Sequence, residues 1–391
     1  MRLRTVNEPA RSSEEPAAQL IAATMRGFGW APTVEYVAPG RPNVVTVVAG
    51  GGGPGPTLLF CGHTDVVTEG DLGEWSVDPY GAELRDGRIY GRGSADMKGG
   101  LAAMVHATAA LQGAGPFPGR VVLAAFADEE GLMLGAKHFA ASPLAREVHG
   151  VIVGEPEAGE VCAVSKGAIR LRVDFVGAMA HGAMPDHGRN PIPALARTAV
   201  GLAALQADLQ RRVSRSEQLG DVYLTPTVAL AGSPEQINVI PGSAALSVDV
   251  RTIPGVDHAA LVADIAALAH SAAAGDGITA EVVVIDDRPP VDTPADHPVV
   301  AALRAAHESV VGAAPIMGGV PGTTDGTILA RDAGLATVVY GPGGKWIAHQ
   351  ADEFVEVVDL KRCARVYLEA ARRFLTGYGP ADREEAAHDR R

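Results

Sequence analysis

The sequence has few cysteines and no long apolar run, and both absences exclude whole classes of protein. Its 391 residues include three cysteines, Cys61, Cys162 and Cys363, which lie far apart. This spacing excludes a disulfide framework and a thiolate zinc site, and it suits the reducing cytoplasm. No apolar stretch approaches the roughly 20 residues that a membrane-spanning helix needs. The first residues, MRLRTV, lack the apolar core of a signal peptide. We therefore expect a cytoplasmic protein with no membrane partner.

A basic surface is absent as well. The chain has 33 basic and 46 acidic residues, a net charge of -13, and no stripe of Lys and Arg. This balance argues against a nucleic-acid partner. Apolar residues make up 47%, which is enough for full globular burial. The length exceeds what one ordinary core holds, so we expect two domains.

An unusual acidic stretch, Asp128-Glu129-Glu130-Gly131, directly follows the apolar run at 121–127. Neighbouring carboxylates raise one another's pKa unless a cation or a shared proton intervenes. Such a turn is either solvated, which is the ordinary case for three acids, or bound to a metal ion.

Other apolar runs of strand length also lead to residues that can bind a metal. The run at 57–61 leads to His63, that at 151–153 to Glu155, and that at 337–340, through a glycine loop, to His349. Asp96 comes just before a helical stretch at 101–112. Because sites in open α/β sheets lie at the carboxyl ends of strands, these side chains are expected to meet.

The order of elements predicts an α/β protein with an inserted domain. Up to about residue 167, strands alternate with helices, which favours a mixed, mostly parallel sheet flanked by helices. The segment 168–286 has the β-α-β-β-α-β order of a ferredoxin-like α+β domain. Residues 286–290 indicate a linker, after which the first pattern resumes. We expect a catalytic domain at 1–167 and 287–380, and a disordered charged tail at 381–391.

The candidate ligands fit a two-metal site. Two cations roughly 3.5–4 Å apart need a carboxylate between them. The candidates are His63, Asp96, Glu130, Glu155 and His349. Asp65, two residues after His63, would orient that histidine, and Glu129 is left as a general base for water. Spacing alone leaves both a metal hydrolase and a structural acidic turn open.

Four motifs resemble the signature of a known family: GHTDVV at 62–67, GRGSADMKG at 91–99, DEEG at 128–131 and VGEP at 153–156. Together they are similar to the di-zinc aminoacylase and carboxypeptidase family. Its members include acetylornithine deacetylase, succinyl-diaminopimelate desuccinylase and glutamate carboxypeptidase. The resemblance continues in the family's order as far as 349–354. It implies a zinc-peptidase-like catalytic domain with an inserted lid and dimerisation domain.

The resemblance also implies roles for the candidate ligands. Asp96 would bridge two divalent metals, zinc in the first place, although cobalt or manganese also suits the ligands. His63 and Glu155 would complete one metal site, and Glu130 and His349 the other. Glu129 would be the general base, with Asp65 supporting His63. A cis peptide is expected at Asp96–Met97.

Further residues are assigned by the resemblance alone. His181 would polarise the scissile carbonyl, often from the partner subunit of a homodimer formed through the inserted domain. Asn238 and Arg251 would hold a substrate carboxylate, a task that suits arginine. Without the resemblance, His181 is an ordinary surface histidine and Arg251 a solvated strand residue. The expected substrate loop includes Gly322, Thr323 and Thr324.

The predicted function is hydrolysis of an amide bond in a small N-acyl amino acid, by a deacylase of the deacetylase or desuccinylase type. A water that bridges the metals would be activated by Glu129. One alternative is a dipeptidase or carboxypeptidase for small peptides. Another is a catalytically silent member that binds a ligand. The complete ligand set, with Glu129 and Asp65 retained, argues against a silent protein. Neither the acyl group nor the amino acid can be named from the sequence.

Overall fold

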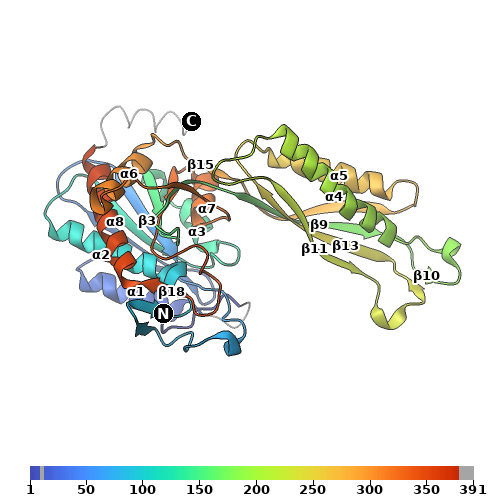
Figure 1. The fold of residues 1–391 in the computed structure, drawn as a ribbon, viewed down its shortest axis with the longest axis horizontal. Coiled ribbons are helices and arrows are strands. Elements are labelled where there is room, and N and C mark those ends of the chain that lie inside the picture. The colour runs from blue at the N-terminus through green and yellow to red at the C-terminus, as the bar shows by residue number, and fades with distance from the viewer. Residues whose placement is uncertain (9–12, 378–391) are drawn as a thin grey trace. The chain divides into compact units, whose positions relative to one another are not determined.

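The computed structural model describes residues 1–8 and 13–377, which form two compact units (Figure 1). The first contains Met1–Val164, Val291–Val320 and the described residues from Thr324 on. The second contains Ser165–Pro290 together with Pro321–Thr323. The tail predicted at 381–391 lies outside the described residues. None of the described helices is both long enough and apolar enough to cross a membrane.

A nine-stranded sheet forms the centre of the first unit, in the order β1-β2-β6-β3-β7-β17-β8-β15, with β16 paired to β8. The strands are β1 (Thr33–Ala38), β2 (Arg41–Ala49), β3 (Thr57–His63), β6 (Arg120–Phe126), β7 (Gly150–Val153), β8 (Val161–Ser165), β15 (Val291–Asp292), β16 (Met317–Val320) and β17 (Thr337–Val339). The four central strands, β6, β3, β7 and β17, pair in parallel. Antiparallel pairs flank them, β1 with β2 and β2 with β6 on one side and β17 with β8 on the other. The predicted mixed, mostly parallel sheet is confirmed.

Two layers of helices cover this sheet. The cluster on one face takes residues from α1 (Glu15–Gly27), α2 (Gly99–Gly113), α6 (Pro298–Val311) and α8 (Val357–Gly377). The cluster on the other face takes them from α3 (Leu134–Ala140) and α7 (Asp325–Ala333). Side chains of β6 alternate between the two clusters, with Leu123 in the first and Val122 in the second. Burial on both faces explains why the central strands are continuous apolar runs.

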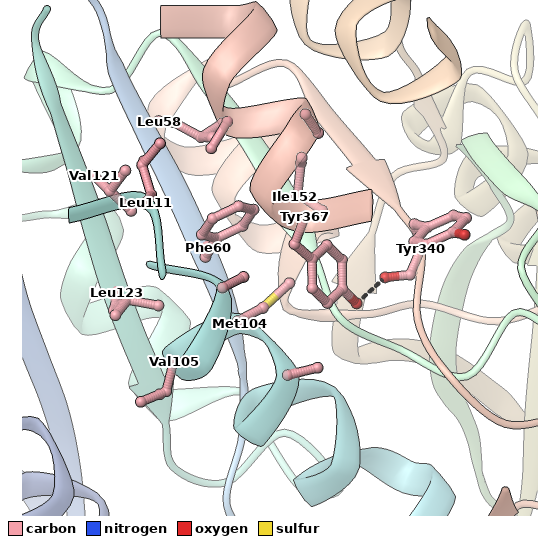
Figure 2. Packing of buried hydrophobic residues seen from close by; sticks show 14 of the residues in the cluster. Leu58, Phe60, Met104, Val105, Leu111, Val121, Leu123, Ile152, Tyr340 and Tyr367 are labelled. Carbon is pink, nitrogen blue, oxygen red and sulfur yellow. Dashed lines mark hydrogen bonds between the residues drawn. The ribbon is translucent and has the colours of Figure 1, made fainter. Parts of the chain in front are cut away.

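Figure 2 shows the first of these clusters, where Phe60 of β3 and Met104 of α2 lie beside Tyr367 of α8. The Tyr367 hydroxyl donates a hydrogen bond to the main-chain carbonyl of Tyr340 at 2.5 Å. The polar atom of this buried ring therefore has a partner, as burial requires.

A small three-stranded sheet lies in the same unit, formed by β4 (Glu83–Arg85), β5 (Arg88–Tyr90) and β18 (Phe354–Glu356). Asp86 and Gly87 have φ of 51° and 75°, which is the conformation of a tight hairpin turn between β4 and β5. Tyr90 pairs with Phe354, so the segment after β5 lies beside the segment before β18. Short helical turns complete the unit: η1 (Leu72–Glu74), η2 (Ser94–Lys98) and η3 (Ala145–Glu147).

The second unit has the predicted ferredoxin-like order. It contains β9 (Gly167–Val176), α4 (Ile192–Arg212), β11 (Tyr223–Ala231), β13 (Ser243–Thr252), α5 (His258–Ala273) and β14 (Thr279–Arg288). Its antiparallel sheet has the order β11-β13-β9-β14. In β9, Leu171 and Val173 are buried while Arg170 and Arg172 are exposed, so one face of the strand is covered and the other is solvated. A two-stranded ribbon, β10 (Ala180–His181) with β12 (Val239–Ile240), and the turns η4 (Pro185–His187) and η5 (Pro234–Gln236) are added to it.

The linker predicted at 286–290 is partly wrong. After an irregularity in the pairing, Asp286, Asp287 and Arg288 continue β14 and pair with β9. Arg288 is buried, and its Nε lies 2.6 Å from Asp286 Oδ2. Charges that suggested a solvated linker therefore neutralise each other at a strand end, and only the two prolines that follow lie outside the strand.

Candidate metal centre

The carboxyl ends of the parallel strands bring the candidate ligands together. His63 is the last residue of β3, Glu130 follows β6, Glu155 follows β7, and His349 lies in the loop after β17. Asp96 comes from η2, directly before α2. A Cβ atom added to Gly62 would lie 1.9 Å from Met97 Cε, so any larger residue before His63 would have to displace the buried Met97 side chain of η2.

The two oxygens of Asp96 face two different histidines. Oδ1 lies 2.9 Å from His63 Nε2, and Oδ2 lies 3.2 Å from His349 Nε2. Glu155 Oε1 lies 3.5 Å from the same nitrogen of His63, and Glu130 Oε1 lies 3.1 Å from that of His349. The possible ligand atoms of His63, Asp96 and Glu155 lie within 4.8 Å of one another, as do those of Asp96, Glu130 and His349. Asp96 thus belongs to both groups.

Glu129 stands beside these groups. Its carboxylate, with His63 and Glu130, forms a third group of atoms within 4.8 Å of one another. Burial raises the pKa of Glu129, and the charges of Glu130 and Glu155 raise it further. Burial also raises the pKa of Glu155 to about 8, with the Asp96 charge as the next cause. Buried carboxylates with raised pKa are groups that need a proton or a cation.

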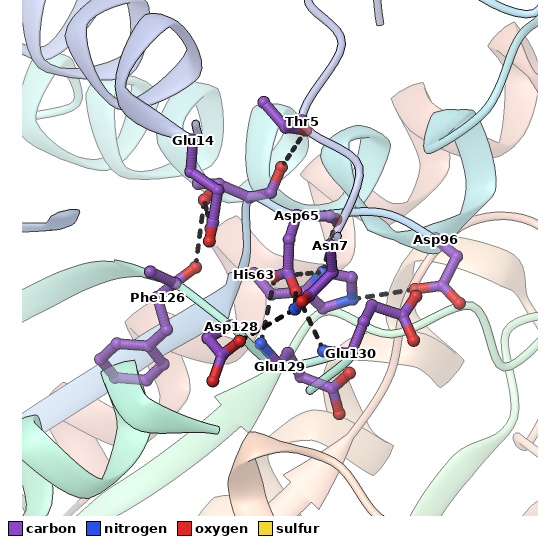
Figure 3. Close-up of polar contacts among 12 residues, drawn as sticks. Thr5, Asn7, Glu14, His63, Asp65, Asp96, Phe126, Asp128, Glu129 and Glu130 are labelled. Carbon is purple, nitrogen blue, oxygen red and sulfur yellow. Dashed lines mark hydrogen bonds and ion pairs between the residues drawn. The ribbon is translucent and has the colours of Figure 1, made fainter. Parts of the chain in front are cut away.

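Asp65 has a wider part than the sequence suggested (Figure 3). His63 Nδ1 lies 2.9 Å from the main-chain oxygen of Asp65 and 3.5 Å from its carboxylate. The carboxylate accepts hydrogen bonds from the main-chain N–H of Glu129 at 3.1 Å and of Glu130 at 3.0 Å. Asn7 Nδ2 donates a third, at 2.6 Å. Asp65 therefore anchors the acidic turn as well as contacting the histidine.

Two supporting residues were missed by the sequence reasoning. Arg92 and Glu353 are both buried, and Arg92 Nη1 lies 2.7 Å from Glu353 Oε2. The other oxygen of Glu353 accepts hydrogen bonds from the main-chain N–H of Ala95 at 2.9 Å and of Asp96 at 3.1 Å. This pair thus holds the segment that carries the shared ligand. The expected cis peptide at Asp96–Met97 is present.

A second acidic cluster, Glu157, Glu160 and Cys162, also has ligand atoms within 4.8 Å of one another. Lys345 Nζ lies 2.8 Å from a carboxylate oxygen of each glutamate. The ammonium group therefore takes the place that a metal ion would need. Because Lys345 is in the loop that carries His349, these ion pairs tie that loop to the one that follows Glu155.

The predicted substrate residues lie at several places. His181 is exposed, and its Nδ1 accepts a hydrogen bond from the Ala183 N–H at 3.0 Å. Asn238 lies next to it, because the main-chain oxygen of Asn238 accepts a hydrogen bond from the Gly182 N–H at 2.7 Å. Both lie beyond the sheet end where Ser243 pairs with Val176. Arg251 lies eight residues along β13 from Ser243, about 27 Å at the rise of a strand. The structure does not bring Arg251 together with the other two in one chain.

The predicted substrate loop is divided between the two units. Gly322 and Thr323 belong to the second unit, and the Thr323 hydroxyl accepts a hydrogen bond from Arg288 Nη1 at 3.2 Å. Thr324 is the N-cap of α7, where its hydroxyl accepts a hydrogen bond from the Gly326 N–H at 3.1 Å. Thr324 therefore has a structural role within the first unit.

A cavity of about 630 Å³ opens beside the candidate metal-binding residue His349, within the first unit. Its lining includes His349, Gln350, Arg92, Glu69 and Glu74. The volume suits a small molecule rather than a folded partner.

The strand-end carboxylates and histidines, on this sheet with its inserted unit, define the class of metal-dependent hydrolases. Residues 59–373 match the pattern of Peptidase family M20/M25/M40, and the chain belongs to that family. The predicted resemblance, fold class and enzyme class, a metal-dependent hydrolase of amide bonds, are confirmed.

Curated relatives and solved structures agree with this assignment. The succinyl-diaminopimelate desuccinylase of Methylorubrum extorquens (strain PA1) is 32% identical over 343 residues, covering 85% of this chain and 86% of that protein. That of Methylobacterium radiotolerans is 31% identical over 366 residues, covering 90% of each. A family M20 metallo-carboxypeptidase from Sulfolobus solfataricus has a TM-score of 0.75 at 18% identity, covering 95% of this chain and 97% of its own. A dinuclear metal-binding peptidase of the same family from Bacillus subtilis has a TM-score of 0.72 at 18% identity, covering 96% of this chain and 97% of its own. At these identities the solved structures show the fold alone.

Proposed function

We propose that this chain hydrolyses the amide bond of a small N-acyl amino acid, as a deacylase of the desuccinylase or deacetylase type. The observation that carries the proposal is the Asp96 carboxylate, whose two oxygens face His63 and His349. The desuccinylase relatives, which align along most of this chain, support the choice of an N-acyl amino acid. A substrate of this kind carries a carboxylate.

Two divalent metal ions are proposed as cofactors, and the residues fit them. Three carboxylates and two imidazoles converge at the carboxyl ends of the parallel strands. They form one group of His63, Asp96 and Glu155 and another of Asp96, Glu130 and His349, which share only Asp96. His63 and Glu155 would hold one ion, Glu130 and His349 the other. We propose zinc because imidazole and carboxylate ligands suit it; cobalt and manganese suit the same set.

The chain's own residues would handle the proton. Two bound ions would polarise the amide carbonyl and make water more acidic. Glu129 would take the proton from the attacking water and give it to the departing amine nitrogen. Its burial, which raises its pKa, suits a group that accepts a proton and then returns it. Asp65 would keep Glu129 in place through the main-chain N–H of that residue.

We also propose a homodimer through the second unit, with His181 and Asn238 serving the partner's site and Arg251 its own. The separation of Arg251 from His181 and Asn238, which lie beyond the other end of β13, supports this division. Every residue of the edge strand β11 except Leu224 is exposed. Exposed apolar side chains on and near this edge include Val228, Leu230 and Ile237, the last 93% exposed. An open apolar edge favours pairing with a second copy.

A cytoplasmic location is proposed from the cysteines. Cys61, Cys162 and Cys363 are all free and buried, which suits a reducing compartment.

The alternative activity is that of a dipeptidase or carboxypeptidase for small peptides. Hydrolysis rates for N-succinyl, N-acetyl and N-formyl amino acids should be compared with those for dipeptides, with zinc, cobalt or manganese added. We expect the N-acyl amino acids to have the higher kcat/KM. A higher kcat/KM for dipeptides overturns the deacylase proposal, and no turnover of any of them favours a ligand-binding protein.

Metal titration followed by equilibrium dialysis tests the cofactor proposal. We expect binding to saturate at two equivalents per chain, and a His349→Ala variant to retain about one because Glu155 and His63 remain. Saturation of the parent at one equivalent would overturn the two-metal site.

Mixing two inactive variants tests the shared site. His181→Ala and Glu129→Gln homodimers should each be inactive, yet a mixed dimer has one site with both defects and one with neither. Activity should therefore reappear on subunit exchange. A monomer by light scattering, or no recovery after proven exchange, would show that His181 does not act across a dimer.

A further inference from the structure

We infer that Asn7 and Arg41 are positioning residues for Glu129, an inference that rests on the proposed role of Glu129 as general base. Both precede residues 59–373, the part that matches the family pattern. They belong to a network, seen in part in Figure 3, that contacts Asp65 and Asp128, the residues that hold the acidic turn. Neither residue was singled out by the sequence.

The Asn7 side chain joins two buried carboxylates. Its Nδ2 donates to Asp65 Oδ2 at 2.6 Å and to Asp128 Oδ1 at 3.0 Å. Its Oδ1 accepts a hydrogen bond from Arg41 Nη2 at 2.8 Å. Both hydrogens and the oxygen of the amide are thus used, and their partners fix which way the amide points. An aspartate here would place a third carboxylate against two others.

Arg41 supplies the positive charge of the network. Its Nη1 lies 2.8 Å from Asp128 Oδ1 and 3.0 Å from Glu14 Oε1. Glu14 is fully buried, and its other oxygen accepts a hydrogen bond from the Thr64 hydroxyl at 2.6 Å. Thr64 lies between His63 and Asp65. The planar guanidinium can contact all three partners at once, which a lysine ammonium does less well.

Two carboxylates of the network, those of Asp65 and Asp128, hold the main chain around Glu129. On one side, Asp65 accepts hydrogen bonds from the N–H groups of Glu129 and Glu130. On the other, Asp128 precedes Glu129 with a left-handed φ of 69°, and its Oδ2 accepts a hydrogen bond from the Leu132 N–H at 3.0 Å. Aspartate adopts this conformation more readily than most non-glycine residues, and here the hydrogen bonds of its carboxylate hold it. Asn7 contacts both Asp65 and Asp128, so the loss of its amide removes one hydrogen bond from each support of the Glu129 main chain.

The consequence is specific to catalysis. A proton-transfer group needs a position accurate to a fraction of an ångström, whereas metal ligation tolerates small shifts through the other ligands. Loosening the turn should therefore lower kcat more than it lowers metal content or raises KM. A purely structural role would lower stability and leave the kcat of the folded protein unchanged.

The test compares Asn7→Leu with Glu129→Gln in metal-saturated full-length protein. Asn7→Leu has a similar volume but no donor or acceptor. We expect kcat to fall by about ten- to a hundredfold with KM nearly unchanged, the size of effect that a small misplacement produces. Asn7→Ser, which cannot span the two carboxylates, should show the same loss if the leucine variant folds poorly.

A double variant separates a role through Glu129 from an independent one. If Asn7 acts through Glu129, then Asn7→Leu combined with Glu129→Gln should have a kcat within about twofold of Glu129→Gln alone, because residues that act as a unit are not additive. Multiplied losses would overturn the inference.

Arg41 offers a matched control. Arg41→Met should lower kcat as Asn7→Leu does. Arg120→Met removes a comparable arginine at the opposite end of β6, where it contacts Thr57 and Glu147, and should leave kcat unchanged. If Glu129→Gln is inactive while Asn7→Leu and Asn7→Ser keep the parental kcat, the inference fails and the proposed function stands. If Glu129→Gln keeps full activity, the proposed function fails first.

Discussion

The buried pair of Arg92 and Glu353 allows a stability prediction with a worked magnitude. Glu353→Ala leaves the Arg92 guanidinium buried without its partner 2.7 Å away, which costs about 3–5 kcal/mol in comparable pairs. The substitution also removes the hydrogen-bond acceptor of the Ala95 and Asp96 N–H groups. Each buried N–H left without an acceptor costs about 1–3 kcal/mol unless a water molecule takes the place of the carboxylate. We expect the free energy of unfolding to fall by at least about 3 kcal/mol, a large part of the 5–15 kcal/mol typical of a domain.

Urea unfolding of the metal-free protein measures this loss. The double variant Arg92→Met with Glu353→Gln removes both charges, and it should be more stable than the sum of the single losses by about 2 kcal/mol. Metal competition with a chelator supplies the second readout. Because Glu353 holds the main chain of Asp96, its loss should weaken metal binding by about tenfold to a hundredfold. A Glu353→Ala protein within about 1 kcal/mol of the parent and with unchanged metal affinity would refute the reasoning.

Further predictions concern pH, the loop of His349 and the packing beside His63. In the metal-free protein burial raises the pKa of Glu155 from 4.5 to about 8, and hydrogen bonds to Asp96 and Glu130 raise that of His349 from 6.5 to about 10. Both groups bind protons more tightly in the folded than in the unfolded state, so the stability of the metal-free protein should fall as pH rises from about 6 to 9. Over the same range the stabilisation by added metal should grow, because the ligands lose their protons. A Tm of the metal-free protein that rises over this pH range contradicts this prediction. Lys345→Met breaks both ion pairs of the His349 loop and should weaken the binding of one metal equivalent by about tenfold, with Lys345→Arg closer to the parent; equal affinities by dialysis would exclude the role. Gly62→Ala should lower the free energy of unfolding by about 1–3 kcal/mol, because the added Cβ would lie 1.9 Å from Met97 Cε and the side chain of Met97 would have to move. An unchanged urea midpoint would contradict this close packing of Met97 against Gly62.

Much of the fold and the ligand set could be predicted from local pattern. The central strands are buried on both faces, so they are unbroken apolar runs that stand out in the sequence. Parallel strands place their carboxyl ends at one edge, so His63, Glu130, Glu155 and His349 could be expected together before any coordinates. The ferredoxin-like order followed from alternation in β9 and from two clear helical segments.

The supports of the site could not be predicted because they join residues far apart in the chain. Arg92 contacts Glu353, Asn7 contacts Asp128, and Lys345 contacts Glu160, at separations of 261, 121 and 185 residues. Charged and amide side chains at such distances leave no periodic signal, and in the sequence they look like solvated surface residues. The end of β14 was misjudged for the same reason, since Asp286 and Arg288 neutralise each other.

The turnover of Glu129→Gln tests the central claim most directly. The substitution keeps the shape of the side chain and removes its ability to carry a proton, and Glu129 is not assigned as a metal ligand. With an N-acyl amino acid that the parent hydrolyses, we expect two metal equivalents to be retained and kcat to fall by about 100-fold or more, the usual contribution of a general base. A Glu129→Gln enzyme that keeps both metals and stays within about tenfold of the parental kcat would contradict the account, because another group would then have to carry the proton.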